Sequence, residues 1–247
     1  MEETNFAVDT EQGFKLQGTL YLKDNAPSDD IVIFCHGLMN TRNSEVNQSI
    51  IKEIDFNSIS FDFQGNGESE GTTRCGNHIE EVENIRCIVC YVRSILKRKV
   101  LCICGHSKGA VVVLLYASKY NDVPLVINIS GRYDHTQIPS YLTSEQFLQR
   151  FGPINDQDYE EFKQLNTSVV KNIDRQKSKV LTVHGSKDNV CPPEGALTYH
   201  KLIGPEPHHK LVMIQDADHG YKNKKNELTA NIRSWLSENF SWASKIN

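Results

Sequence analysis

The strongest constraint on the fold of this chain is the sequence Gly-His-Ser-Lys-Gly at residues 105–109, together with what surrounds it. The apolar run 100–104 before it predicts a buried strand, and the apolar run 110–116 after it predicts a helix. A serine between two glycines at such a junction is typical of a nucleophile elbow. The sharp turn strains the serine backbone, and side chains at either glycine would collide with the neighbouring strand or helix. We therefore expect Ser107 to be a nucleophile presented at the edge of a sheet.

Continuous apolar runs alternate with helical patterns along most of the chain. The runs that predict strands lie at residues 14–22, 31–35, 58–63, 100–104, 125–129, 180–183 and 210–214. Helices are predicted at 44–53 and 78–96, the second from one apolar face made of Ile79, Val82, Ile85, Val89, Val92 and Leu96. Buried strands that alternate with helices predict an α/β fold, with a mostly parallel central sheet and helices on both faces. Ligands of such folds bind beyond the carboxyl ends of the strands.

The segment 133–178 breaks this alternation, because it is polar and carries scattered aromatic residues. We interpret it as a small cap of short helices inserted over the site, and the alternative is a surface excursion that does not contact substrate. The length of the chain fits one domain over residues 1–247 with this cap inserted. Four aromatic side chains of the cap are expected to line the substrate pocket: Tyr141, Phe147, Tyr159 and Phe162.

A serine nucleophile requires a base and a third group that orients the base. His219 follows the last predicted strand, and Asp188 follows the predicted strand before it. The chain order Ser107, Asp188, His219 therefore predicts a catalytic triad. Asp134 also follows a predicted strand and is the alternative acid, although Asp188 is preferred. Three other histidines at predicted strand ends are interpreted as structural or pocket-lining: His36, His106 and His184.

An oxyanion hole requires two N–H donors that converge on the developing charge. We expect one donor to be the backbone N–H of Lys108, and the other to be the N–H of Leu38 in the loop that begins His36-Gly37. The Lys108 side chain could favour anionic intermediates or carboxylate-bearing substrates, since it lies near a helix N-terminus. The preferred alternative is an outward-pointing lysine paired with Asp or Glu.

Composition excludes several other classes of protein. A net charge of -4 leaves no electrostatic footprint for nucleic acid. The acidic start and the lack of any apolar segment of about 20 residues predict a cytoplasmic protein with no secretory signal and no membrane span. The seven cysteines are expected to be reduced, and the pair Cys87 and Cys90 is predicted to hold neither zinc nor a disulfide. No cofactor or metal is expected.

Together these motifs resemble the α/β-hydrolase superfamily, specifically its serine aminopeptidase-like and monoacylglycerol-lipase-like esterases. Residues 61–69, 105–109, 116–120 and 129–134 are similar to a plant group of esterases that is described as feruloyl-esterase-like. The similarity runs through nearly the whole chain, although the predicted cap is shorter than the cap of that group. The resemblance implies the α/β-hydrolase fold, and it implies the same triad and oxyanion donors as the residues predict.

The sequence therefore predicts a cofactor-free serine hydrolase of the carboxylesterase type. Its expected partner is a small or medium ester, aromatic esters included, that reacts through an acyl-enzyme intermediate. The same machinery also serves thioesters or acyl transfer, because the fold does not select among them. An alternative of a different class is a ligand-binding receptor or sensor that keeps the triad but turns over slowly or not at all.

Overall fold

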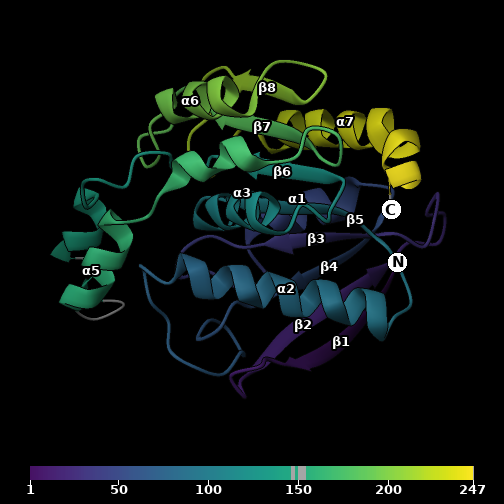
Figure 1. Cartoon of the computed structure of the whole chain (residues 1–247), viewed down its shortest axis with the longest axis horizontal. Helices are drawn as coiled ribbons and strands as arrows, with labels where there is room; N and C mark the ends of the chain where they lie inside the picture. The colour runs from purple at the N-terminus through teal and green to yellow at the C-terminus, as the bar shows by residue number, and fades with distance from the viewer. Residues whose placement is uncertain (146–147, 150–153, 247) are drawn as a thin grey trace.

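A central sheet organises the computed structural model, which describes residues 1–145, 148–149 and 154–246 (Figure 1). In that part of the chain the sheet has eight strands: β1 (Glu2–Asp9), β2 (Lys15–Leu22), β3 (Ile31–Cys35), β4 (Asn57–Phe61), β5 (Val100–His106), β6 (Leu125–Ile129), β7 (Lys179–Gly185) and β8 (His209–Ile214). Their spatial order is β1-β2-β4-β3-β5-β6-β7-β8. Strand β2 is antiparallel to both of its neighbours, and the remaining pairs are parallel. The predicted mostly parallel sheet is confirmed.

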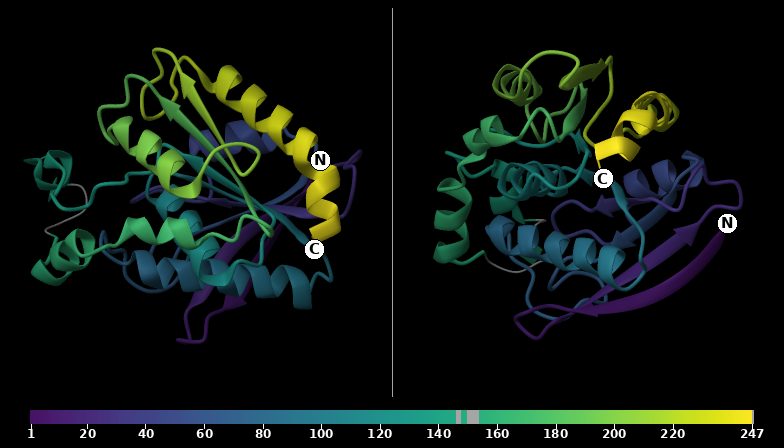
Figure 2. Two further views of the ribbon diagram at one scale, coloured as in Figure 1. Left: turned by 45° about the horizontal axis from the view of Figure 1, so that its top comes forward. Right: turned by 45° about the vertical axis from the view of Figure 1, so that its right-hand side comes forward.

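Helices cover both faces of the sheet, as predicted. The described helices are α1 (Glu45–Glu53), α2 (His78–Ser94), α3 (Lys108–Tyr120), α5 (Asp156–Lys163), α6 (Glu194–Ile203) and α7 (Lys225–Ile246), with the 3₁₀ helices η1 (Ser140–Thr143) and η2 (Thr167–Asn172). One face carries α2, α3 and α6, and the other carries α1 and α7 (Figure 2). Successive residues of β3 alternate between the two cores: Ile31 and Ile33 face α2 and α3, while Val32 and Phe34 face α1 and α7.

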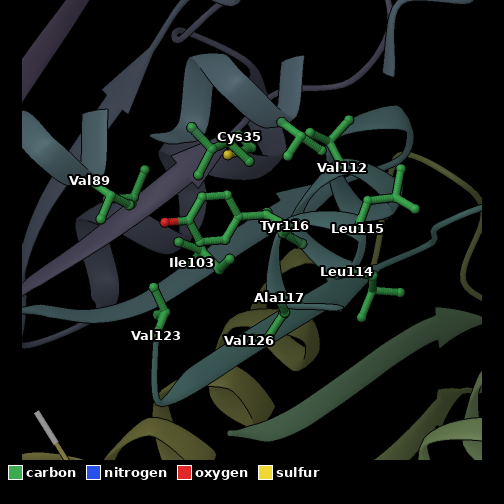
Figure 3. Close-up of a cluster of buried hydrophobic side chains, with 14 of the residues drawn as sticks. Cys35, Val89, Ile103, Val112, Leu114, Leu115, Tyr116, Ala117, Val123 and Val126 are labelled. Atoms are coloured by element: carbon green, nitrogen blue, oxygen red, sulfur yellow. The ribbon is translucent and has the colours of Figure 1, made fainter. Parts of the chain in front are cut away.

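Helix α3 is enclosed by the sheet, α2 and η2, and it is buried along most of its length. Tyr116 lies at the centre of this core, where its ring packs among aliphatic side chains from β5, α2 and α3 (Figure 3). A helix that is apolar on all sides is stable only when it is buried in this way. The buried helix holds its own N-terminus, and hence Ser107, in a fixed position at the carboxyl edge of the sheet.

Helix α2 differs from its predicted pattern in its first turns. Ile79 was expected on the buried face, but it is 59% exposed. The polar residues Glu81 and Asn84 are buried instead, because each has a partner: Glu81 binds Lys108, and the Asn84 amide oxygen accepts the N–H of Gln64. Buried polar groups with hydrogen-bond partners displace an aliphatic side chain without a large free-energy cost.

The segment between β6 and β7 contains η1, α5 and η2. Figure 1 shows α5 at the left end of the molecule, beyond the ends of α2 and α3, and Figure 2 agrees. Arg74, in the loop before α2, binds Asp158 and Glu161 of this helix. Helix α5 is therefore attached to the carboxyl edge of the sheet, where the predicted site residues also lie.

Candidate active site

Ser107 lies at the junction of β5 and α3 with a positive φ of 58° and a ψ of −120°. This backbone conformation is strained for a residue with a side chain. A Cβ at Gly105 would lie 2.2 Å from the carbonyl oxygen of Gly109, and a Cβ at Gly109 would lie 2.4 Å from that of His36. The two glycines therefore let strand, turn and helix approach closely, as the sequence predicted.

His219 connects Ser107 with Asp188. Its Nε2 is 2.9 Å from the Ser107 hydroxyl oxygen, and its Nδ1 is 2.8 Å from Asp188 Oδ2. If Nδ1 carries the proton and donates it to the carboxylate, Nε2 is free to accept from the serine hydroxyl. The three side chains come from the carboxyl ends of β5, β7 and β8, so the sheet brings together residues that are far apart in the sequence.

Asp188 is buried and held by several donors. Its Oδ1 accepts the N–H groups of Val190 at 2.9 Å and Cys191 at 2.8 Å, while His184 Nε2 lies 3.4 Å from Oδ2. Burial alone would raise the pKa of Asp188, but hydrogen bonds from His184 and His219 outweigh it and lower that pKa well below its ordinary value. The group therefore remains a carboxylate facing His219.

The alternative acid, Asp134, is exposed and does not face His219. Its carboxylate accepts two hydrogen bonds from Thr136, one from the backbone N–H at 2.8 Å and one from the hydroxyl at 2.7 Å. This is the local turn geometry in which Asp is common. The geometry favours Asp188 as the partner of the histidine.

Two further histidines at strand ends brace the surrounding loops. His36 Nδ1 lies 2.7 Å from the Gly37 carbonyl, while its Nε2 accepts the N–H of Phe63, and burial lowers its pKa to about 4. Burial also lowers the pKa of His106 to about 3, and its Nε2 lies 2.9 Å from the His219 carbonyl. Both rings are therefore neutral near pH 7, and each holds a loop of the site in place.

The two residues predicted to donate to the oxyanion line the same cavity as Ser107. Lys108 is the first residue of α3, and Leu38 follows Gly37, where a Cβ would lie 3.1 Å from Ser107 Cβ. Within the described residues neither N–H has a protein acceptor. Unpaired N–H groups at a helix N-terminus are suited to stabilising an anion.

The Lys108 side chain has an acidic partner, as preferred, but it points inward and not outward. It is only 8% exposed, and its Nζ donates to Glu81 at 2.7 Å, to the Arg74 carbonyl at 2.9 Å and to the side chain of Asn77. The reason is that α2 places a buried carboxylate next to the start of α3. The ion pair neutralises this lysine.

A small cavity lies next to Ser107, with a volume of about 20 Å³, which is room for roughly one water molecule. Ten residues line it: Leu38, Cys75, His78, Ser107, Lys108, Val111, Arg132, His135, Phe162 and Cys191. Both predicted oxyanion residues are among them. A substrate acyl group can enter this space only if a wall residue moves.

Phe162 is the predicted pocket aromatic that the structure brings to Ser107. It projects from α5 into the cavity wall, and its ring centroid is 4.7 Å from that of His135 and 6.0 Å from that of His78. Both ring pairs are tilted, with interplanar angles of 55° and 59°, and contacts between aromatic rings at such separations are favourable. These contacts link α5 to the loops around the nucleophile.

Of the other three predicted pocket residues, the structure places the side chain of only one, Tyr159. Tyr159 lies on α5 but does not line the cavity. The backbone of Tyr141 belongs to η1, while its side chain, and the whole of Phe147, lie outside the described residues.

Sequence reasoning missed six residues of the cavity wall: Cys75, His78, Val111, Arg132, His135 and Cys191. Isolated residues in loops form no periodic pattern, so Cys75 and Cys191 left no signal. Arg132 follows β6 closely, and its place beyond a carboxyl strand end could have identified it. All seven cysteines are free, and no cluster of His, Cys, Asp and Glu in the described residues could hold a metal ion. No described helix is long and apolar enough to cross a bilayer.

Comparison with known proteins agrees with this geometry. The uncharacterized protein YqkD of Bacillus subtilis is 23% identical over 93% of this chain and 77% of its own length. The structure of Est1E from Butyrivibrio proteoclasticus with ferulic acid bound superposes with a TM-score of 0.78 at 20% identity, covering 96% of this chain and 99% of that one. The Pyrococcus furiosus esterase Pf2001 gives a TM-score of 0.77 at 20% identity, over 96% and 91% of the two chains.

The family model of the prolyl oligopeptidase family matches residues 83–242, which is more than half of the chain and includes all three residues of the Ser-His-Asp arrangement. The fold, the serine at the elbow and the family match agree with one another. This chain belongs to the prolyl oligopeptidase family and is an α/β hydrolase of the serine hydrolase type.

Proposed function

We propose that this protein is a serine carboxylesterase that hydrolyses small or medium esters, aromatic esters included, through an acyl-enzyme. The observation that carries the proposal is the continuous hydrogen-bonded chain from Asp188 through His219 to Ser107, with contacts of 2.8 Å and 2.9 Å. In this chain Ser107 is the nucleophile, His219 the general base and Asp188 the residue that orients the base.

The reaction begins when Ser107 Oγ attacks the ester carbonyl carbon while His219 Nε2 takes the hydroxyl proton. The oxyanion that forms is stabilised by the backbone N–H groups of Leu38 and Lys108, and each such donor contributes about 3 kcal/mol in comparable enzymes. His219 then gives its proton to the departing alcohol, which leaves an acyl group on Ser107. Water activated by the same histidine releases the acid.

Several observations support an ester as substrate. One structural neighbour contains ferulic acid and another is named an esterase. Phe162, His78 and His135 form an aromatic wall on which a flat aromatic group can pack once a wall residue moves and the cavity opens. We also propose that residues 1–247 form one domain and that 133–178 acts as its cap, with Phe162 as the residue that contacts the acyl group. A peptide is the second candidate substrate, because the family model is that of an oligopeptidase family.

The test compares nitrophenyl acetate, nitrophenyl butyrate, an alkyl ester of a hydroxycinnamic acid and a prolyl nitroanilide. We expect Ser107→Ala to lower ester hydrolysis by roughly a thousandfold or more, and Asp188→Asn by a similar factor. Asp134→Asn is the matched control and should keep the activity of the parent protein. Unchanged melting temperatures establish that each variant folds.

Four results would contradict the proposal in different ways. Full esterase activity in Ser107→Ala excludes this nucleophile, and a greater loss in Asp134→Asn than in Asp188→Asn transfers the orienting role. Cleavage of the nitroanilide alone identifies a peptidase. Labelling of Ser107 by a fluorophosphonate without turnover of any substrate identifies a receptor or sensor that retains the triad.

A further inference from the structure

The cationic group that Lys108 brings to the cavity is already neutralised. Its ammonium group is buried against the Glu81 carboxylate, and that carboxylate is itself only 2% exposed. A buried charge pair of this kind is stable only while both partners remain. Lys108 therefore has no free charge to offer a substrate.

The other titratable residues of the cavity wall are neutral near pH 7. Burial lowers the pKa of His135 to about 4 and that of His78 further still. Burial raises the pKa of Cys75 to about 11 and that of Cys191 to about 12. Desolvation thus keeps two imidazoles and two thiols uncharged on the walls of this cavity.

Arg132 is the exception among the cavity-lining residues. It follows β6 at the carboxyl edge of the sheet, and one of its guanidinium nitrogens donates to the Val190 carbonyl. In the described part of the chain no Asp or Glu forms an ion pair with it, and Asp134 is bonded to Thr136 instead. A guanidinium has five N–H donors, so most of its donors are available to a ligand.

Arg132 also lies close to the nucleophile. The small cavity next to Ser107 is lined by Arg132 and Cys191 as well as by Ser107 itself. The guanidinium and the nucleophile therefore share one small cavity, and a short acyl chain bonded to Ser107 would lie near Arg132 once a wall residue moves to admit it. Arginine pairs with carboxylates through two parallel hydrogen bonds, which fixes the orientation of the bound group.

We propose that Arg132 selects substrates whose acyl group ends in a free carboxylate, such as a monoester of a short dicarboxylic acid. The proposal rests on the proposed serine hydrolase activity and adds its substrate class. Among the titratable residues that line the cavity, Arg132 is the cation without an ion-pair partner in the described residues, and a cation on otherwise neutral walls favours an anionic ligand. Arg132 is thus a specificity residue, and Ser107 remains the nucleophile for every ester.

The experiment measures kcat/KM for monoethyl succinate and for diethyl succinate, which differ by one ionised carboxylate. We expect the parent protein to prefer the monoester by roughly tenfold or more. Arg132→Gln should lower kcat/KM for the monoester by roughly 10- to 100-fold and change the diester rate by less than about threefold. For Arg132→Lys we expect a kcat/KM for the monoester between the values of the parent protein and of Arg132→Gln. Lys187→Gln, which removes an exposed cation on the loop before Asp188, is the matched control.

The diester rate separates the possible failures. If the parent protein hydrolyses diethyl succinate through Ser107 but does not prefer the monoester, the carboxylate proposal is wrong and the esterase proposal stands. Equal losses of kcat/KM on both esters in Arg132→Gln would show that Arg132 only positions the loop at Val190. That result would also overturn the carboxylate proposal. If neither ester, nor any ester of the earlier panel, is hydrolysed, the esterase proposal fails and the carboxylate proposal fails with it.

Discussion

Ser107 can adopt its strained conformation because the residues two positions before and after it have no side chains. Gly105 and Gly109 touch each other's backbone across the turn, and Gly109 also lies against the end of β3. These contacts leave no space for a methyl group. The strain at the nucleophile is thus maintained by close packing of three backbone segments.

At the residue scale we predict that Gly105→Ala destabilises the protein by about 3 kcal/mol or more, because its Cβ would overlap a helix carbonyl that cannot move freely. Gly220→Ala is the matched control, since nothing lies within 4 Å of a Cβ at that position. Urea denaturation followed by circular dichroism measures both. Equal stability of the two variants would mean that the elbow tolerates a side chain there.

Single residues also show what the sequence could and could not predict. Ser107 and His219 were predictable because each follows an apolar strand, and the carboxyl ends of parallel strands meet at one edge. The inward orientation of Lys108 was not predictable, because its partner Glu81 lies on a different helix. Arg132 follows β6, so its position at the carboxyl edge was predictable, but its place in the wall of the cavity next to Ser107 depends on how separate loops pack together.

At the scale of elements, Arg74 joins α5 to α2 and to the loop before α2. This guanidinium binds Asp158 at 2.8 Å and Glu161 on α5, and it binds Glu80 of α2 at 3.0 Å. It is mostly buried, unlike most surface ion pairs, and it makes three contacts at once. A network of this kind contributes more than an isolated exposed pair.

We predict that Arg74→Met loosens α5 and speeds amide hydrogen exchange over residues 156–163, because the carboxylates of that helix lose their common partner. Lys163→Met is the matched control, since it removes an exposed ion pair with Glu160 on the same helix. Exchange followed by mass spectrometry measures both variants. An unchanged exchange rate in Arg74→Met would assign the attachment of α5 to Phe162 alone.

The sequence pattern did not predict strand β1, because its side chains do not form a regular apolar pattern. Strand β1 begins with polar, exposed residues at the edge of the sheet, and only Phe6 and Val8 pack inward. Phe6 stacks on Tyr91 of α2 and lies directly over Gly18 of β2, which leaves room for the ring. The central strands were predictable because both of their faces are buried, whereas an edge strand depends on contacts that a local pattern does not contain.

At the scale of the whole molecule, five buried histidines have lowered pKa values. Burial lowers the pKa to about 4 for His36 and His135, to about 3 for His106 and His209, and well below its ordinary value for His78. They occur on both sides of the sheet and near the site. All are neutral in the folded protein at pH values where they become charged in the unfolded chain.

We predict that the free energy of unfolding falls as the pH drops from about 6.5 toward 4, because the unfolded chain binds protons that the folded protein does not. Each such histidine contributes a slope of up to about 1.4 kcal/mol per pH unit. Urea denaturation at about pH 7 and about pH 5 measures the loss. His209 lies away from Ser107, so the His209→Gln variant should keep the active site intact. It should take up about one proton fewer on unfolding, which lowers the slope of the unfolding free energy against pH. Equal stability at both pH values would contradict the prediction.

The three residues of the proposed triad have unequal support from the fold. Ser107 follows β5 in the interior of the sheet, whereas Asp188 follows β7 and His219 follows β8, the outermost strand on that side. Local unfolding starts at edges, where fewer contacts must break. Fraying of β8 would therefore remove His219 while Ser107 stays in place. On heating, activity should be lost before the core unfolds. The catalytic rate then measures whether β8 is still paired at the edge of the sheet.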